Sequence, residues 1–461
     1  MSQHPFRTSR RSFLKGLTVT TAGGIILPNI LLAQDGVPAS KKLGIACIGV
    51  GGKGESDMTA AAKDNEVVAI CDVDAKNLEK AAQKYPNAKQ FRDFRKMLDE
   101  VKEIDAVTVS TSDHAHYPAA MHAIAQGKHV CVQKPLTNTI WEARELHAAA
   151  KKKGVITQMG NQGHTYEENR VLKEWLAAGA IGKVREAHVW TNRPIWPQGN
   201  SVTMKPGSAP EHLDWQLWLA QSVDHPYSPE IHPFKWRGFL EFGAGALGDM
   251  GCHNLDPIFW GLDLGMPQRI EAETRELTDI AWPLGATVKY HWKNVPNHGE
   301  FTLFWYEGKK ADGSANLPEA PKELEGKKIG TTGFMLIGSD GVIYNEGDQA
   351  NKKMKILPEQ RSQDFLAKPL EKTLPRSPRP GNPQEEWTVA IKEGKAFPFM
   401  SQFDYSVPLT ELCLLGALAM RCGRPIEWNA DKMEVTGMPE AAKFIKRQAV
   451  RPGWDYSSAK V

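Results

Sequence analysis

Apolar and polar positions in residues 41–160 alternate between two patterns. Short, continuous apolar runs, typical of strands buried on both faces, predict strands at residues 43–48, 66–71, 106–110, 129–132 and 155–159. The stretches between them predict helices over residues 77–85, from about 94 to 101, and over 117–126 and 140–153. Repeated strand–helix alternation implies right-handed crossovers. We therefore expect an α/β fold here, a doubly wound parallel sheet with helices on both faces.

From about residue 161 the pattern changes. Alternating positions, typical of strands with one exposed face, run over residues 184–192, 270–278, 286–292, 299–305 and 333–338. Helices are predicted over 169–178, 385–395 and 407–421, and the polar stretches 307–332 and 352–382 are predicted loops. These elements predict a C-terminal α+β domain over residues 161–455 with a large, mostly antiparallel open sheet. One face of such a sheet packs on a core and the other can meet a partner or subunit.

The first predicted strand leads into a G-x-G-x-x-G loop that begins at Gly49 and includes Gly52. In such a loop Gly49 permits a tight turn, Gly51 lets the backbone approach a pyrophosphate, and Gly54 lets helix and strand pack closely. Asp72 ends the second strand, 18 residues after Gly54, where a carboxylate accepts hydrogen bonds from ribose hydroxyl groups. An ordinary glycine turn is the alternative, but the full succession of elements favours a dinucleotide site. The same carboxylate would repel a 2′-phosphate, so NAD is favoured over NADP.

Polar residues gather where the strand ending at Ser110 meets the next helix, at the edge where doubly wound sheets bind ligands. Ser112 or Asp113 could simply cap that helix. The two histidines of this segment are two residues apart and would face opposite ways in an extended loop, which argues against a metal pair. We expect a cap, with Thr111 at the cofactor and His116 facing the site.

Gln133 and Lys134 follow the next strand, again at its carboxyl end. A lysine at such a position is often merely solvated. Beside a nicotinamide, however, an ammonium group can polarise a substrate hydroxyl and stabilise developing alkoxide charge. We therefore expect both residues at the cofactor and Lys134 at the substrate.

Asp249 and His253 are four residues apart in a glycine-rich segment and would share one face of a helix. A histidine beside a carboxylate is a sensible general base. The alternatives are a helix cap with a packed histidine, or a metal site that includes His232. Pro257 weakens the helix argument, because it cannot donate a hydrogen bond to the carbonyl of residue 253. We expect no metal.

Composition narrows the classes of partner. The formal charge is +3, but four basic residues and no acid lie in residues 1–34, and the rest of the chain has 53 basic and 54 acidic residues. No basic face is implied, so nucleic acid is not an expected partner. Three of the six cysteines lie in predicted buried strands, and no C-x-x-C occurs. No later apolar run is expected to span a membrane.

The N-terminal segment resembles a twin-arginine export signal, with Arg10-Arg11 followed by a weakly apolar stretch to about residue 34. Two chance arginines before a buried helix are the alternative. We expect residues 1–34 to be a signal peptide read by the twin-arginine export machinery, and the protein to be periplasmic. Substrates of that route generally cross the membrane folded, so we expect an NAD that is loaded before export and then retained.

Taken together, these motifs resemble the glucose–fructose oxidoreductase/inositol dehydrogenase family (Gfo/Idh/MocA) over about residues 42–455, in its exported twin-arginine subgroup. The family's Glu-Lys-Pro motif matches Gln133-Lys134-Pro135, with glutamine in place of glutamate, and its Asp-x-x-x-His motif matches Asp249 to His253. The resemblance implies that Lys134 contacts nicotinamide and substrate, that His253 is the general base, and that Asp249 orients the substrate or the histidine. It also implies a homodimer or homotetramer.

The resemblance implies an NAD-dependent oxidoreductase acting on a secondary hydroxyl or keto group of a sugar, cyclitol or glycoside. A glycosidase that uses NAD transiently, by oxidation, elimination, addition and reduction, is the second hypothesis. A non-catalytic dinucleotide-binding protein is the third, and the presence of the lysine, aspartate and histidine argues against it. Candidates for stacking on the sugar or hydrogen bonding to it, if they are not simply core residues, are Trp190, Arg193, Trp215, Trp236 and Arg237.

Overall fold

The structure is a computed structural model that describes residues 42–457. The predicted signal peptide, residues 1–34, lies outside the described residues. So do residues 35–41 and 458–461.

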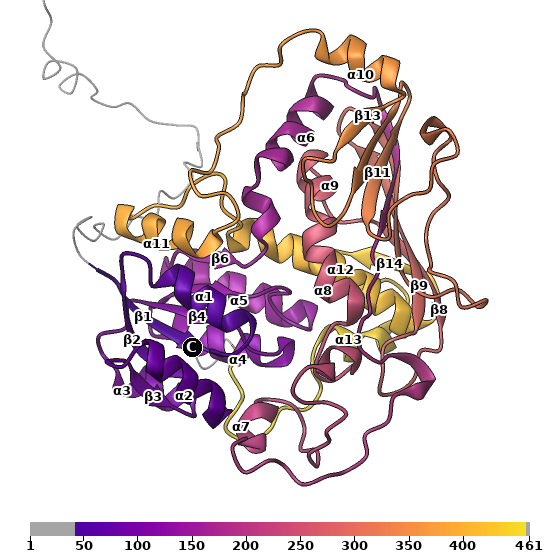
Figure 1. Ribbon diagram of the computed structural model, residues 1–461. Helices are drawn as coiled ribbons and strands as arrows, with labels where there is room; N and C mark the ends of the chain where they lie inside the picture. Colours follow the sequence, from indigo (N-terminus) through magenta and orange to yellow (C-terminus); the bar gives the residue numbers. More distant parts are fainter. Residues whose placement is uncertain (1–41, 458–461) are drawn as a thin grey trace, which may run out of the picture. The chain divides into compact units, whose positions relative to one another are not determined.

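The N-terminal part is built on a six-stranded, fully parallel sheet, as predicted (Figure 1). Its order is β3-β2-β1-β4-β5-β6, formed by β1 (Gly44–Ile48), β2 (Glu66–Cys71), β3 (Lys89–Phe91), β4 (Ala106–Val109), β5 (His129–Val132) and β6 (Thr157–Met159). The helices between them are α1 (Lys53–Ala61), α2 (Ala75–Lys84), α3 (Phe94–Glu100), α4 (Asp113–Ala125) and α5 (Ile140–Lys153). The strand order reverses between β1 and β4, and ligands of doubly wound sheets bind at that point.

The C-terminal part contains a nine-stranded sheet of order β13-β12-β11-β7-β10-β9-β8-β14-β15. Only β7 and β10 pair in parallel, so the prediction of a mostly antiparallel sheet is confirmed. The strands are β7 (Val184–Trp190), β8 (Arg269–Arg275), β9 (Gly285–Val295), β10 (Gly299–Gly308), β11 (Gly333–Gly338), β12 (Val342–Glu346), β13 (Lys355–Leu357), β14 (Ile426–Asn429) and β15 (Glu434–Val435). The helices are α6 (Glu167–Ala177), α7 (Trp215–Leu219), α8 (Gly245–Asn254), α9 (Asp256–Gly261), α10 (Glu359–Leu366), α11 (Pro383–Glu393), α12 (Phe403–Cys422) and α13 (Ala442–Ile445).

The prediction that residues 352–382 form a loop is wrong in its first half, which holds β13 and α10. Strand β13 has three residues, too few to show a period. Helix α10 has no buried residue, so it lacks the apolar stripe from which a helix is predicted.

The last two long helices return to the first sheet. Trp387 of α11 is fully buried in a cluster with Leu43 and Ile45, and its indole N–H donates to Ile156 O at 3.0 Å. Helix α12 packs against α5 and α8. By length and composition α12 could cross a membrane, an exception to the expectation from sequence, but 83% of its apolar window is buried in the fold. It is therefore a core helix here.

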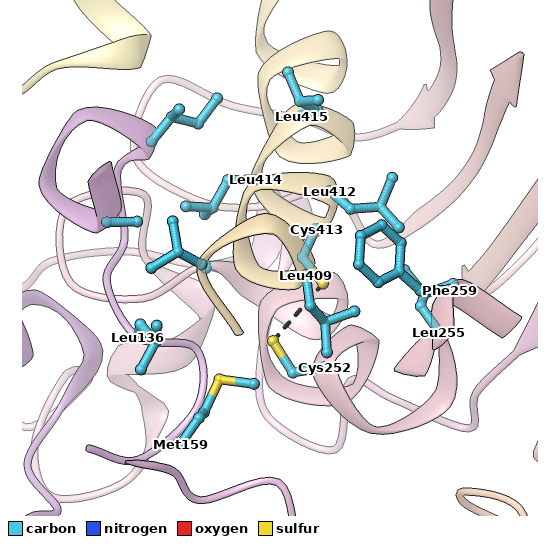
Figure 2. Packing of buried hydrophobic residues seen from close by; sticks show 14 of the residues in the cluster. Leu136, Met159, Cys252, Leu255, Phe259, Leu409, Leu412, Cys413, Leu414 and Leu415 are labelled. Atoms are coloured by element: carbon cyan, nitrogen blue, oxygen red, sulfur yellow. Dashed lines mark hydrogen bonds between the residues drawn. The ribbon is translucent and has the colours of Figure 1, made fainter. Parts of the chain in front are cut away.

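Figure 2 shows how α12 meets the helix that carries the predicted catalytic pair. Cys413 of α12 faces Cys252 of α8, and their sulfur atoms lie 3.8 Å apart among leucine side chains. Cys252 immediately precedes His253, so this contact holds α8 against α12 next to His253. The buried cysteines in β1, β2 and β5 confirm the prediction that they act as small apolar residues.

Candidate active site

The glycine loop between β1 and α1 has the close contacts that the motif predicts. Gly49 has a φ of +76°, and a Cβ there would lie 2.6 Å from the carbonyl oxygen of Ser110. A Cβ at Gly54 would lie 1.9 Å from the carbonyl oxygen of Gly49. Helix α1 starts after Gly52 without a side-chain cap, and the positive end of its dipole, at the glycine loop, favours an anion there. The loop therefore fits a bound pyrophosphate.

Asp72 stands at the end of β2, directly behind this loop. Its Oδ2 accepts a hydrogen bond from Val50 N at 2.9 Å, and its Oδ1 accepts one from Asp74 N at 2.8 Å. Burial raises the pKa of Asp72, and these backbone hydrogen bonds oppose the rise. The carboxylate lines the same cleft as Gly49 and Gly51, so it is placed to meet the ribose of a dinucleotide.

Lys134 follows β5 of the parallel sheet, and Asp249 lies on α8 of the C-terminal part. Their side chains meet in the cleft. The Lys134 ammonium donates to Asp249 Oδ1 at 2.9 Å and to Asp249 O at 2.8 Å. Arg237 Nε lies 3.4 Å from the same Oδ1. Burial alone would raise the pKa of Asp249, but the positive charges of Lys134 and Arg237 outweigh it and lower that pKa to about 2. Asp249 is therefore an anion that holds two cations at the site.

His253 lies one helical turn after Asp249 on α8, and both line the cleft, as the spacing predicts. Helix α8 ends at Asn254, and Pro257 falls in the first turn of α9, where its missing N–H costs nothing. Burial, followed by the positive charge of Lys134, lowers the pKa of His253 to about 3. Its Nδ1 is buried and has no hydrogen-bond partner within residues 42–457. The ring is thus neutral and can accept a proton.

These groups share one cleft of about 870 Å³. Its lining unites both halves of the predicted site: Gly49, Gly51, Gly52, Asp72, Ser110, Thr111, His116, Gln133, Lys134, Arg193, Trp236, Arg237, Asp249 and His253. The cleft contains a glycine loop that fits a pyrophosphate, a carboxylate that fits a ribose, and a lysine–histidine pair that fits a substrate hydroxyl. These groups match the parts of NAD and of its substrate. Among residues 42–457, no three metal-binding side chains form a group that could hold an ion.

His116 reaches the cleft, and each of its ring nitrogens faces a backbone carbonyl, only one of which can receive the single N–H of a neutral ring. Nδ1 lies 2.8 Å from the carbonyl oxygen of Pro135, and Nε2 lies 3.2 Å from that of Thr111. Burial lowers its pKa to about 4, so it is a neutral group tying two loops together. The helix begins at Asp113 after Ser112, and neither forms the predicted side-chain cap within the described chain: the Asp113 carboxylate accepts from Ala244 N instead.

Two of the predicted sugar-stacking residues do not reach the cleft. Trp190 is fully buried in the cluster around Met335, and its indole N–H donates to Gly330 O at 2.8 Å. Trp215 stacks on Trp218 with its N–H on a backbone carbonyl. Isolated tryptophans are more often core than ligand contacts, and these two are core.

The remaining candidates do face the substrate end. Arg237 lies over the Trp236 ring, with its central carbon 4.2 Å from the ring centroid, and over Phe234 at 5.0 Å. Arg193 lines the cleft nearby. Aromatic rings next to guanidinium groups can stack on a sugar and bond its hydroxyl groups.

Sequence reasoning missed two acids. Asp57 is buried under the cleft floor and accepts hydrogen bonds from Ser110 and Gln133. The only sequence signal was its spacing of four from Lys53, with which it pairs. Asp113 lines the cleft, and burial raises its pKa to about 7. Its position before a predicted helix indicates only a helix cap.

Two family models match this chain. The first, an oxidoreductase family with an NAD-binding Rossmann fold, covers residues 43–161, and the second, the C-terminal α/β domain of the same family, covers residues 180–297. Together they span just over half of the chain. The chain belongs to the Gfo/Idh/MocA oxidoreductase family. Its first sheet is thus the family's NAD-binding domain, and the glycine loop and Asp72 fit that cofactor.

Relatives in the Gfo/Idh/MocA family include sugar and cyclitol enzymes. The chain is 30% identical over 238 residues to D-glucoside 3-dehydrogenase of Escherichia coli (strain K12), covering 51% of this chain and 58% of that protein. It is 24% identical over 263 residues to scyllo-inositol 2-dehydrogenase (NADP(+)) IolW of Bacillus subtilis (strain 168), covering 57% and 60%. The matched regions therefore span less than two thirds of these relatives.

Solved structures share the fold over most of this chain. The WlbA dehydrogenase from Bordetella pertussis, crystallised with NADH and UDP-GlcNAcA, superposes with a TM-score of 0.59 at 17% identity, over 85% of this chain and all of that one. Levoglucosan dehydrogenase, in complex with NADH and levoglucosan, superposes with a TM-score of 0.54 at 16% identity, over 84% and 99%. At these identities the likeness establishes the architecture.

Proposed function

We propose that this protein is an NAD-dependent oxidoreductase that acts on a secondary hydroxyl or keto group of a sugar, cyclitol or glycoside. One observation carries the proposal. Lys134, Asp249 and the neutral His253 lie in the same cleft as the glycine loop and Asp72. A proton acceptor and a fixed ammonium thus stand at one end of a dinucleotide site.

The charge of each residue determines its role in the proposed reaction. The chemistry that NAD supplies when bound is acceptance of a hydride at its nicotinamide ring. Lys134 donates a hydrogen bond to the substrate oxygen and stabilises the negative charge that develops there. His253, neutral because burial and Lys134 lower its pKa to about 3, takes the hydroxyl proton. Asp249 keeps the ammonium in place through two hydrogen bonds.

The substrate class rests on the relatives and on the lining of the cleft. The names of the relatives, a D-glucoside 3-dehydrogenase and a scyllo-inositol 2-dehydrogenase, both describe oxidation of a ring hydroxyl. The Trp236–Arg237 pair offers a stacking surface beside hydrogen-bond donors. Asp72, which would repel a 2′-phosphate, supports NAD over NADP.

A clasp over the adenosine end supports a retained cofactor. We use "clasp" for residues 212–218, which pair with the segment that follows Asp72. Leu213 forms an antiparallel bridge with Asp74, and His212 Nδ1 lies 2.9 Å from Asp74 Oδ1. Leu217 and Trp218 line the same cleft as Asp72. A dinucleotide enclosed in this way would leave slowly.

Retention agrees with the export proposal. The twin-arginine pattern at Arg10-Arg11 supports transport of a folded, loaded protein to the periplasm. A retained cofactor would have to be reoxidised in place by a second carbonyl substrate. We propose in addition a homodimer or homotetramer, as the resemblance implies.

The variant His253→Ala tests the proposed reaction. We expect it to bind NADH as the parent does and to lose turnover with every sugar that the parent oxidises, because the ring nitrogens of His116, the other neutral histidine that lines the cleft, face backbone carbonyls. His147→Ala on α5 is the matched control, since His147 lies against Asp404 outside the cleft. A binding protein would be indifferent to both changes. Cleavage of a glycoside with no lasting reduction of NAD would favour the transient-NAD glycosidase instead.

A further inference from the structure

Asp57 is a buried carboxylate that takes no part in the proposed chemistry. It is 1% exposed, and its two oxygens accept hydrogen bonds from four side chains. Oδ2 accepts from Ser110 Oγ at 2.7 Å and from Gln133 Nε2 at 2.8 Å. Oδ1 accepts from Gln384 Nε2 at 2.8 Å and from the ammonium of Lys53. A buried carboxylate with this many donors is held in one position.

The four donors come from four segments of the chain, three of which line the cleft. Lys53 begins α1 directly after the glycine loop, Ser110 follows β4, Gln133 follows β5, and Gln384 lies on α11. Lys53, Ser110 and Gln133 also line the cleft. Asp57 therefore joins the start of α1, directly after the glycine loop, to the carboxyl ends of β4 and β5.

The contact with Gln133 bears on Lys134, the next residue. Gln133 N donates to Val109 O at 2.9 Å, which fixes the backbone, and its side chain packs against Gly160, where a Cβ would lie 2.3 Å from Nε2. The Gln133 amide is thus confined to face Asp57. The chain enters Lys134 from this anchored residue, and the Lys134 ammonium then reaches Asp249.

We propose that Asp57 and Gln133 form one positioning unit that sets where the Lys134 ammonium stands. The inference rests on the proposed function only in taking Lys134 as the group that meets the substrate. The Asp57 carboxylate on α1 accepts a hydrogen bond and the Gln133 amide after β5 donates one, so the two groups are complementary. A glutamate at 133, as in the family motif, would place two buried carboxylates within hydrogen-bonding distance, and one of them would have to take up a proton. The unit therefore explains the glutamine.

Exchange of the two groups tests this coupling. The variants are Asp57→Asn, Gln133→Glu and the double variant that carries both, which moves the carboxylate to the strand end and the amide to the helix. The first readout is the rate at which acetic anhydride acylates Lys134, measured by mass spectrometry against Lys151, an exposed lysine in the same sample. The second is kcat/KM with a sugar that the parent oxidises.

We expect each single variant to release Lys134, which then reacts faster than in the parent, and to lower kcat/KM on the order of 100-fold, the cost of a misplaced catalytic group. The double variant should return both values toward those of the parent, because it restores one carboxylate and one amide. Effects of the two changes that simply add would overturn the proposal, as would Lys134 reactivity unchanged in both single variants.

Folding is checked by the Tm of each variant. If Asp57→Asn does not fold, Gln133→Met keeps Asp57 and the side-chain volume but removes the N–H donor. Faster acylation of Lys134 in that variant supports the unit, and an unchanged rate overturns it. A parent protein that binds no NADH would contradict the proposed function, whereas the acylation rates would still decide whether Asp57 positions Lys134.

Discussion

The Lys134 ammonium donates two hydrogen bonds to a single residue, Asp249, one to its carboxylate at 2.9 Å and one to its backbone oxygen at 2.8 Å. The lysine follows a strand of the NAD-binding sheet and the aspartate lies on α8 of the other part of the chain. The pair therefore fixes how the cofactor half and the substrate half of the cleft are placed relative to each other. It also places a positive charge next to His253, which contributes to keeping that ring neutral.

Removal of that charge should alter His253. In Lys134→Met we expect the pKa of His253 to rise from about 3 toward its ordinary value, because a repelling cation is gone while Asp249 and Asp256 still attract the protonated ring. Turnover should fall about 10²–10³-fold, as when one donor to a developing oxyanion is lost. The pKa is measured by NMR titration of the histidine ring protons. Lys151→Met is the control, and a His253 pKa unchanged by Lys134→Met would contradict the electrostatic account.

Gly54 should be intolerant of a side chain. In Gly54→Ala the new Cβ would meet the carbonyl oxygen of Gly49 at 1.9 Å, so the glycine loop and the start of α1 must move. We expect the Kd for NADH, measured by fluorescence titration, to rise at least tenfold, a loss of about 1.4 kcal/mol or more. Gly265→Ala is the matched control, because nothing lies within 4 Å of a Cβ there. Equal affinity in both variants would show that the loop does not hold the cofactor.

The clasp should govern the rate at which the cofactor leaves. His212→Ala removes the contact between His212 and Asp74, worth about 0.5–1.5 kcal/mol as a hydrogen bond, so NADH should dissociate roughly two- to tenfold faster. Stopped-flow displacement of NADH by excess NAD measures that rate. His147→Ala removes a similar His–Asp contact, of 2.8 Å, elsewhere on the surface and should leave the rate unchanged. A clasp without a role would give the same rate in all three proteins.

Acid should destabilise this fold through its buried histidines. Burial lowers the pKa to about 3 for His114 and His253 and to about 4 for His116 and His129. Because the unfolded chain binds these protons near pH 6.5 and the folded chain does not, their contribution to stability is fully present above about pH 6.5 and is lost as the pH falls toward 4.

The contribution of one histidine to this dependence of the free energy of unfolding on pH can be measured. His116→Gln should reduce the dependence of the free energy of unfolding on pH, between about pH 6 and 4, by roughly 1.4 kcal/mol per pH unit, the value for one proton. Urea unfolding at several pH values measures the slope independently of any change in overall stability. An unchanged slope would mean that His116 takes up its proton in the folded protein too.

Local signals were enough for elements whose ends are set by their own residues. Helix α5 could be predicted to the residue, because Thr139 caps its start and Gly154, with a φ of +66°, ends it. Helix α4 begins at Asp113, four residues before the predicted start, and holds Pro118 inside it. Pro118 has no N–H to donate to the carbonyl of His114, and that carbonyl accepts a hydrogen bond from the side chain of Gln221 instead. That partner is 107 residues away, so no local pattern could reveal it.

The candidate site divides in the same way. The glycine loop, Asp72, Lys134, Asp249 and His253 are recognisable by spacing, since each follows a strand or shares a helix face. Trp190 could not be separated from Trp236 by sequence, because both are tryptophans in the same predicted domain and only the packing shows which one faces the cleft. Asp57 could not be identified from the sequence, because three of its four partners, Ser110, Gln133 and Gln384, come from distant segments.

The most direct test uses protein purified from the periplasm without added cofactor. The absorbance band of reduced nicotinamide is recorded before and after addition of sugars, cyclitols and glycosides. The account predicts bound NAD that is stably reduced by at least one of them in the parent protein and by none in His253→Ala. A preparation without any dinucleotide would contradict the retained cofactor. Bound NAD that no compound in the panel reduces, in a protein that leaves every glycoside intact, would contradict the proposed oxidoreductase.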